Sequence, residues 1–220
     1  MFLNFRKRVI EHELMDESEP EAARLCVKNL AHVNRIFGGH AILRQLLRRA
    51  GCQHAPFSLL DVGSASGDTA KIVTGCYPDG TVVSLDRNAV HIAGAPAPKV
   101  LADAFRLPFP PRSFDYVFSS LFLHHFTNEQ IVGLLRDFAR VARKAVLISD
   151  LERHVVPYLF FPATKWIFGW HPIAVYDGKI SIRAALREPE LVSLARRAGL
   201  GELDAAVHRP AFRISLVGRV

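Results

Sequence analysis

The sequence predicts an α/β protein built on an open, mostly parallel, doubly wound sheet. From about residue 57 onward, apolar and β-branched runs of strand length alternate with amphipathic stretches of helical period. Several of these runs end in an acid, and ligands bind at the carboxyl ends of strands in such sheets. A length of 220 residues suits one domain of this kind with an appendage.

The composition is that of a globular protein, with 50% hydrophobic and 22% charged residues. A net charge of +7 raises the question of an anionic partner such as nucleic acid or a membrane surface. Its arginine pairs, Arg48-Arg49 and Arg196-Arg197, fall in separate helical stretches without interleaved aromatic residues. This dispersal favours a solvated basic surface, so we expect no specific nucleic-acid partner.

Cysteine usage indicates a reducing compartment. Cys26, Cys52 and Cys76 are odd in number and too far apart for a metal knuckle, so we expect reduced thiols and no metal site. The first eight residues lack an apolar signal core with a cleavage site. We therefore expect a cytoplasmic protein.

Residues 1–54 are predicted to form an N-terminal helical cap. A first amphipathic helix begins near Ser18 and ends near Gly38, and a second closes at Gly51. Between them, the run Asn34-Arg35-Ile36-Phe37-Gly38-Gly39-His40 places polar residues beside two glycines. This junction could fold over a ligand, or it could be only a helix cap and a turn.

The first strand of the sheet ends in the run Asp61-Val62-Gly63-Ser64-Ala65-Ser66-Gly67-Asp68, a tight turn that opens a helix. Small residues here let a ligand approach the backbone and the free amides of the helix start. A phosphate loop is excluded because Asp68 replaces the required lysine. A dinucleotide fingerprint is weakened because the small residues fall two apart and a final glycine is missing.

Two later strands end in acids that suit an adenosine ligand. Asp86 closes a β-branched run and can accept hydrogen bonds from both hydroxyls of a ribose. Asp103 closes a short third strand at residues 98–104, where a carboxylate and the amide of Ala104 could meet an adenine ring. An aspartate at the end of a strand is also a common turn former.

The central motifs resemble those of class I S-adenosylmethionine-dependent methyltransferases, in particular the small-molecule branch. They are Asp-x-Gly-x-Ala-x-Gly at 61–67, Asp-Ala-x-x-Leu-Pro-Phe at 103–109, Ser-Phe-Asp-Tyr-Val at 113–117, and Leu123-His124-His125. Ala65 departs from the glycine often found there. The resemblance implies a Rossmann-like domain over residues 55–220, with strand order 3-2-1-4-5-7-6 and strand 7 antiparallel.

It also implies S-adenosylmethionine as the cofactor. Within this frame, Gly63 and Gly67 are expected to give the ligand room, while Asp61 orients the turn or the amino group of the methionine. The expected cofactor contacts are Asp61, Gly63, Ser64, Gly67, Asp86, Arg87, Asp103, Ala104, Ser119, Ser120 and Arg35.

For catalysis, we expect a base that removes a proton from the acceptor, and histidine does this near neutral pH. His124 and His125, just past the fourth strand, are the candidates, although one of them could merely pack at that junction. Further candidates are His154 with Asp150, and more weakly His40 and His171.

Residues 151–187, after the fifth strand, are predicted to form a lid. Within them, residues 155–170 are apolar and aromatic, but Pro157, Pro162 and Lys165 interrupt a run too short to span a bilayer. The position beyond the carboxyl ends of the strands suits a cover for an apolar substrate, with ordinary core helices as the alternative. A helix starting at Glu188 and a terminal hairpin complete the chain.

The chain also resembles bacterial methyltransferases associated with polyketide pathways, which carry an Asn-Arg-x-x-Gly-Gly-His junction and a His-Asp-Gly-x-x-Ser-x-Arg segment. Here Tyr176 stands in place of that histidine. We expect O-methylation of a phenolic, quinonoid or polyketide-like compound. The strand-four motif lacks Asp/Asn-Pro-Pro-Tyr, which disfavours N-methylation of nucleic-acid bases. The alternatives are an RNA or protein methyltransferase, or a non-catalytic subunit that uses 155–170 to contact a partner or membrane surface.

Overall fold

The computed structural model describes residues 5–11, 14, 32, 34–52, 55–168 and 172–220. The first predicted helix, apart from its last residues, and His171 lie outside the described residues. The division into a cap of residues 1–54 and a domain of residues 55–220 stays a prediction.

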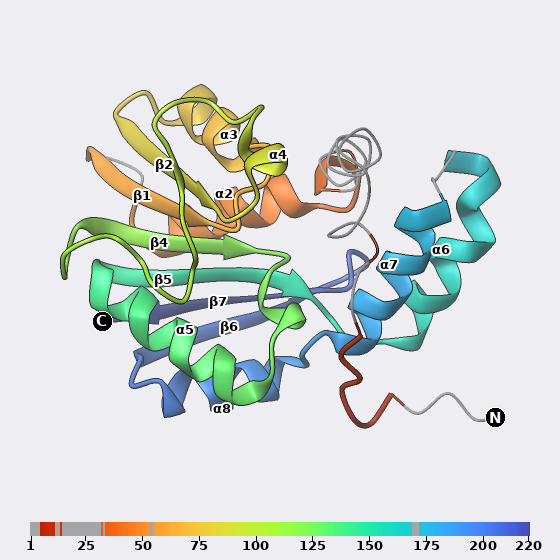
Figure 1. The fold of residues 1–220 in the computed structure, drawn as a ribbon. Helices are drawn as coiled ribbons and strands as arrows, with labels where there is room; N and C mark the ends of the chain where they lie inside the picture. The colour runs from red at the N-terminus through yellow and green to blue at the C-terminus, as the bar shows by residue number, and fades with distance from the viewer. Residues whose placement is uncertain (1–4, 12–13, 15–31, 33, 53–54, 169–171) are drawn as a thin grey trace.

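A single seven-stranded sheet forms the framework, in the order β3-β2-β1-β4-β5-β7-β6. Neighbouring strands from β3 to β5 run parallel, and β7 runs antiparallel to both β5 and β6 (Figure 1). The expected strand order is confirmed, including the terminal hairpin. The strands are β1 Phe57–Val62, β2 Gly80–Asp86, β3 Lys99–Leu101, β4 Phe114–Ser120, β5 Ala142–Leu151, β6 Gly201–His208 and β7 Arg213–Arg219.

Helices cover both faces of the sheet, which explains why its central strands are apolar on both sides. In β1, Leu60 and Val62 pack with α5 and α8 on one face, while Leu59 packs with α2 and α3 on the other. Figure 1 shows α5 and α8 in front of the sheet and α2 and α3 behind it. The helices in these layers are α2 Gly39–Arg49, α3 Asp68–Cys76, α4 Ala89–Ile92, α5 Asn128–Val141 and α8 Glu188–Arg197.

Local sequence signals set the ends of these helices. Thr127 and Gln130 form a capping box at the start of α5, with the Gln130 amide 3.3 Å from the Thr127 hydroxyl. After α2, Gly51 takes a φ of +89°, which an L side chain rarely adopts. These caps fix where the chain turns back toward the sheet.

Beyond the carboxyl ends of β4 and β5, α6 (Val155–Phe168) and α7 (Pro172–Ala184) form a separate helical pair (Figure 1). Its base is anchored by Arg153, whose guanidinium donates to the Ala185 carbonyl and the Glu190 carboxylate, both at 2.6 Å. No helix within the described ranges is long and apolar enough to cross a membrane.

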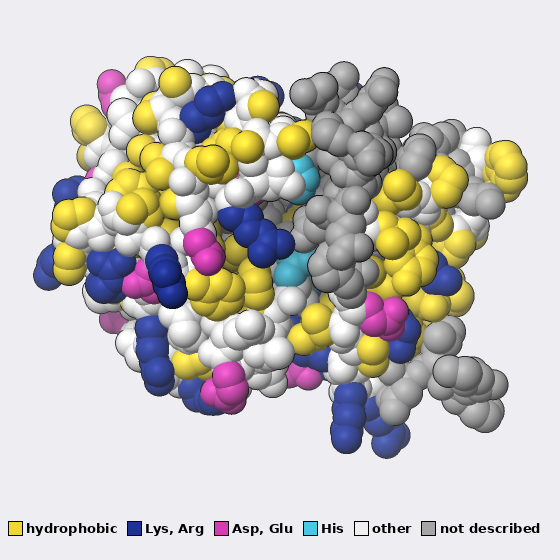
Figure 2. Space-filling view, in the orientation of Figure 1, with side chains coloured by type: hydrophobic (Ala, Val, Ile, Leu, Met, Phe, Trp, Pro, Cys, Tyr) yellow, Lys and Arg dark blue, Asp and Glu magenta, His cyan; other side chains and the backbone are white. Residues whose placement is uncertain are grey.

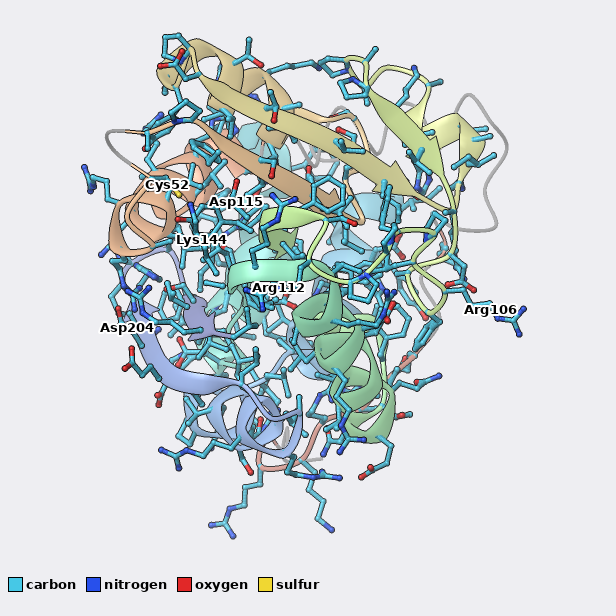
Figure 3. The ribbon with its side chains drawn as sticks, turned by 90° about the vertical axis from the view of Figure 1, so that its left-hand side faces the viewer. Cys52, Arg106, Arg112, Asp115, Lys144 and Asp204 are labelled. Carbon is cyan, nitrogen blue, oxygen red and sulfur yellow. The ribbon has the colours of Figure 1, made fainter. Side chains whose placement is uncertain are left out.

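At the opposite end of the strands, where β1 and β4 begin, polar contacts join neighbouring strands. Asp115 accepts from the Ser58 amide at 2.9 Å and pairs with Lys144 at 3.2 Å (Figure 3). Nearby, burial raises the pKa of the Cys52 thiol to about 11, so this thiol is protonated and unreactive. The unpartnered polar side chains described below, on Asp61, Ser149 and Arg213, lie toward the carboxyl ends of the parallel strands.

Candidate cofactor and acceptor site

The turn after β1 is shaped by a backbone that only small residues allow. The amides of Gly63 and Ser64 both donate to the Leu85 carbonyl, at 2.9 and 3.0 Å. Gly63 has a φ of +71°, and a Cβ there would lie 2.6 Å from the ring of Phe122. Glycine is therefore required at this position both by backbone conformation and by the close approach of an aromatic ring.

Asp86 holds this turn in place. Its Oδ2 accepts from the amide of Ala65 at 3.0 Å, and its Oδ1 accepts from the amide of Asn88 at 2.9 Å. Ala65 has a φ of +44°, in the left-handed region, at the position where the sequence departs from the glycine of the motif that it resembles. Each oxygen retains a further lone pair, so contact with a ribose stays possible. Nothing in the sequence indicated the hydrogen bond between the Asp86 carboxylate and the Ala65 amide.

A shallow cleft, open to solvent, lies along this turn. Four of the predicted cofactor residues line it, and the structure therefore brings together the end of β1, its loop and the end of β4. The lining residues are Asn34, Asp61, Gly63, Ser64, Ala65, Ser66, Asp68, Thr69, Ser120 and Leu121.

Asp61 is the charged group most strongly affected by its surroundings in this cleft. It is 2% exposed, and its Oδ2 has no hydrogen-bond partner among the described residues. Burial raises its pKa to about 7; a hydrogen bond from Thr69 opposes that rise, and the carboxylates of Asp86 and Asp68 add to it. An unpartnered carboxylate oxygen beside a glycine turn fits a ligand that carries an ammonium group, as the methionine part of S-adenosylmethionine does.

The remaining predicted cofactor residues lie outside this lining. Ser119 donates to the Val62 carbonyl at 3.0 Å inside the sheet and is 1% exposed. Asp103 is exposed, lies two residues past the end of β3, and accepts from the Phe105 amide at 2.9 Å. The other members of this group are Asp86, whose contacts with the turn are given above, the buried Ala104, the exposed Arg35 and Arg87, and Gly67, where a Cβ would lie 2.7 Å from that of Ala95.

His124 and Asp150 form a buried pair, and His124 follows Leu121, which lines the cleft, by three residues. The Nδ1 of His124 lies 2.7 Å from Oδ1 of Asp150, and the His124 amide donates to Oδ2 at 3.2 Å. Burial alone would raise the pKa of Asp150, but its contacts with His124 and the Leu151 amide hold that pKa below the usual value. The carboxylate is therefore ionised and fixes the orientation of the imidazole.

Arg8 holds the turn that carries His124 and His125 by hydrogen bonds to its carbonyls, and the sequence did not indicate this role. Its guanidinium donates to the carbonyls of His124 and Phe126, at 3.2 and 2.9 Å. It also donates to the Asn128 side chain at 2.7 Å and to the Ala184 carbonyl at 2.6 Å. The N-terminal stretch thereby joins the end of α7 to the turn η2 (Leu123–His125) after β4.

The other candidate histidines have different surroundings. His125 is half-buried, and its ring lies 4.3 Å from that of His124, tilted by 32°. His154 accepts from the Val156 amide at 3.1 Å at the start of α6, and His40 lies 2.6 Å from Asp68 beside the cleft. Figure 2 shows histidine side chains along the hollow in the middle of this face.

Comparison with known proteins agrees with this geometry. Residues 60–148 match the family described as methyltransferase domain. This match covers less than half of the chain and, together with the sheet order, supports a class I S-adenosylmethionine-dependent methyltransferase. The cofactor of that class is S-adenosylmethionine.

Individual relatives differ in what they act on. The chain is 34% identical over 116 residues to a demethylmenaquinone methyltransferase of a Roseiflexus species, covering 50% of this chain and 48% of that protein. It is 33% identical over 101 residues to a tRNA (carboxymethyluridine(34)-5-O)-methyltransferase of Schizosaccharomyces pombe, covering 43% and 42%. The chain thus spans about half the length, or less, of these relatives.

Among solved structures, human N-acetylserotonin methyltransferase in complex with S-adenosylmethionine has the same fold, with a TM-score of 0.66 and 13% identity. The match covers 91% of this chain and 56% of the human chain. At this identity the likeness concerns the fold alone.

Proposed function

We propose that this protein transfers a methyl group from S-adenosylmethionine to an oxygen atom of a small phenolic, quinonoid or polyketide-like acceptor. The observation that carries this proposal is the buried pair of His124, in the turn after β4, and Asp150, on β5; Ser120, at the end of β4, lines the cofactor cleft. A base beside the cofactor suits an acceptor that must lose a proton. The demethylmenaquinone methyltransferase relative supports a ring-type acceptor.

The cofactor cleft supplies binding and orientation. Bound S-adenosylmethionine would provide a methyl group on a sulfonium, so this chain need not activate the methyl carbon. Asp61, with its unpartnered oxygen, would hold the amino group, and Asp86 would hold the ribose while fixing the turn at Ala65. These contacts would set the direction from which an acceptor can approach.

The His124–Asp150 pair would accept the proton of the acceptor hydroxyl. Because Asp150 is ionised and lies 2.7 Å from Nδ1, it favours the tautomer with the proton on that nitrogen. In that tautomer Nε2 is the ring nitrogen without a proton, so it is the atom that would accept the proton of the acceptor. Asp150 also stabilises the resulting imidazolium ion, and His125 stacks beside it.

The α6–α7 pair supports an apolar acceptor. Tyr158 packs edge-on against Phe5 at 5.4 Å, and Phe160 packs against Phe37 at 5.7 Å, so the pair contacts the N-terminal segments beside the cleft. Hydrophobic side chains gather over these helices in Figure 2. We assign the pair the role of a cover over the acceptor.

Radiolabelled S-adenosylmethionine and a panel of matched acceptors test this function. A phenol, an aniline and a thiophenol on one ring system would be compared, with transfer expected to the phenol and the position of the label checked by mass spectrometry. Transfer to nitrogen or sulfur alone would contradict O-methylation. Calorimetric titration with S-adenosylmethionine and with NADH checks the cofactor, and binding of NADH alone would contradict it.

A tRNA acceptor is the second candidate, supported by the net charge of +7 and by the Schizosaccharomyces pombe relative. The association constant for tRNA should then fall steeply between roughly 50 and 200 mM salt. A plot of its logarithm against the logarithm of the salt concentration should have a negative slope of several units. Absent or salt-independent binding would remove this candidate.

A third candidate is a subunit that uses α6 to contact a membrane surface or partner. Val156 and Leu159 are 46% and 54% exposed on this helix. Flotation with anionic and neutral vesicles, and sizing of a variant in which both residues become serine, would separate surface binding from a cover.

The unpaired thiols Cys52 and Cys76 support a cytoplasmic location.

A further inference from the structure

Arg213, the first residue of β7, is a buried cation whose hydrogen bonds are unmet. Its residue is 1% exposed, and none of its three guanidinium nitrogens has a hydrogen-bond partner among the described residues. Burial lowers its pKa to about 10, which still leaves it charged at neutral pH. An unpaired charge away from water is strongly unfavourable, so folding alone gives no reason for an arginine at this position.

The strand register shows on which face Arg213 lies. Side chains alternate along β7, and Ser215 and Val217 point toward α2, since Ser215 contacts Arg49 at 3.2 Å and Val217 packs with the core residues of that helix. Arg213 therefore leaves the sheet on the face that α2 covers. Asp150, whose charge acts on Arg213, pairs with Ile214 on the other face and already binds His124.

A second unpartnered group lies next to it. The hydroxyl of Ser149 on β5 is 1% exposed and has no partner in the described part of the chain. Ser149 pairs directly with Ser215, so Ser149 and Arg213 are diagonal neighbours with Cα atoms about 7–8 Å apart. Ser215 is itself held by His208 at 2.8 Å.

The start of α2 adds a third feature. Its N-cap is Gly38, which has no side chain that could accept from the helix amides, and the first turn contains no acid. A Cβ at Gly38 would lie 3.5 Å from that of Ala211, two residues before Arg213. The positive end of a helix whose N-cap residue supplies no side-chain acceptor thus lies at the same end of the strands as the guanidinium of Arg213.

We propose that Arg213, with Ser149, forms a subsite for the carboxylate of the acceptor molecule. A carboxylate would satisfy the fork of the guanidinium with two hydrogen bonds and accept a third from the serine hydroxyl. The inference rests on the proposed function, which it narrows to acceptors that carry both a ring hydroxyl and a carboxylate.

The position of the subsite favours the acceptor over the cofactor as the source of the carboxylate. Ser120, at the cofactor cleft, pairs with Ser149, which pairs with Ser215. At about 4.8 Å between strands, β7 lies about 10 Å from β4 and about 14 Å from β1, whose turn holds the cofactor. An aromatic acceptor lying across β4 and β5 would span that distance.

Wild-type protein would be titrated with benzoate and with benzamide, a neutral molecule of the same shape, using thermal unfolding and calorimetry. We expect benzoate to raise the melting temperature and benzamide to leave it unchanged. Arg213→Met should lose at least tenfold in benzoate affinity, and its ligand-free melting temperature should equal or exceed that of wild type, because an unpaired buried charge is removed. Arg213→Gln provides a second variant should the methionine not fold.

Arg219→Met is the matched control. Arg219 lies on the same strand and the same face, is half-exposed and pairs with Glu202 at 3.3 Å. The Arg219→Met variant should bind benzoate with the affinity of the wild type. The affinity for S-adenosylmethionine should be unchanged in all of these variants.

Benzoate affinity that survives in both Arg213 variants, or equal stabilisation by benzamide, would overturn the subsite. Loss of S-adenosylmethionine affinity in Arg213→Met without loss of benzoate binding would assign the arginine to the cofactor and overturn the acceptor assignment. Because benzoate binding requires no methyl transfer, failure of the proposed function would be seen separately, in the labelled-methyl assay.

Discussion

The Oδ2 of Asp86 lies 3.0 Å from the backbone nitrogen of Ala65, so the end of β2 and the turn after β1 are held as one unit. A single carboxylate therefore shapes the turn, and we propose that it also binds the ribose of the cofactor. Removing the Asp86 carboxylate should lower cofactor affinity both by loosening the turn and by removing an acceptor for the ribose.

Asp86→Ala should weaken S-adenosylmethionine binding by about tenfold to a hundredfold, or about 1.5–3 kcal/mol, because two backbone amides and the ligand lose an acceptor. Isothermal titration measures this directly. Glu202→Ala, at an exposed acid on β6, is the control and should bind normally. Unchanged affinity in Asp86→Ala would refute its role.

The raised pKa of Asp61 predicts that cofactor binding depends on pH. With a folded pKa of about 7 against 3.8, the folded ligand-free protein holds an extra proton between these values, so its stability falls as pH rises through this window. An ammonium bound at Asp61 would favour the ionised carboxylate. Affinity should therefore rise by up to about tenfold per pH unit below pH 7 and level off above it.

Calorimetry at pH 6 in two buffers of different ionisation enthalpy would detect the proton released on binding. Asp61→Asn should abolish this release and flatten the dependence of the unfolding free energy on pH between 5 and 8. Binding at pH 6 without proton release in the wild type would show that Asp61 does not meet the charged end of the ligand.

The His124–Asp150 pair predicts a division between catalysis and binding. His124→Asn keeps an amide nitrogen near the position of Nδ1, so Asp150 retains a partner while Nε2 is lost. We expect kcat to fall by about 10²–10⁴-fold with unchanged cofactor affinity. Asp150→Asn should give a smaller loss and shift the pH dependence of kcat, because the imidazolium loses its counter-ion.

The same measurements on His125→Asn and His154→Asn separate the remaining histidines. His154 caps α6 through the Val156 amide, so its substitution should affect stability more than kcat. If the His124 and His125 variants both keep wild-type kcat across pH, the proton leaves by another route.

Gly63→Ala should destabilise the protein by about 1–3 kcal/mol, because the new Cβ would meet the Phe122 ring at a positive φ. Gly75→Ala is the matched control, since it lies in α3, where a methyl group would have no neighbouring atom within 4 Å. There alanine should stabilise by up to about 1 kcal/mol. Urea denaturation compares the two, and equal stabilities would contradict the steric argument.

Much of the fold could be predicted because its signals are local. Apolar and β-branched runs of strand length marked β1 and β2, the Thr127–Gln130 box marked the start of α5, and Gly51 marked the end of α2. The third strand was placed too far along the chain: it ends at Leu101 and not at Asp103. Short edge strands have few buried residues, so their ends are set by neighbouring contacts.

The site was predicted only in outline. Asp61, Gly63, Ser64 and Ser120 meet at one cleft because parallel strands bring their carboxyl ends to a common edge. Nothing in the sequence showed that Gly67 faces Ala95, or that Ser119 donates into the sheet. These contacts depend on how a loop and a strand pack against segments distant along the chain.

By itself, the sequence determined the alternation of strands and helices, the small-residue turn after β1, and, through family resemblance, the strand order and the cofactor. Only the tertiary structure decided that His124 meets Asp150 and that Arg8 locks their turn. It alone also left Arg213 buried without a hydrogen-bond partner among the described residues. The physical reason is that periodicity and capping act between near neighbours, whereas charge pairing and burial depend on which distant segments the folded sheet brings together.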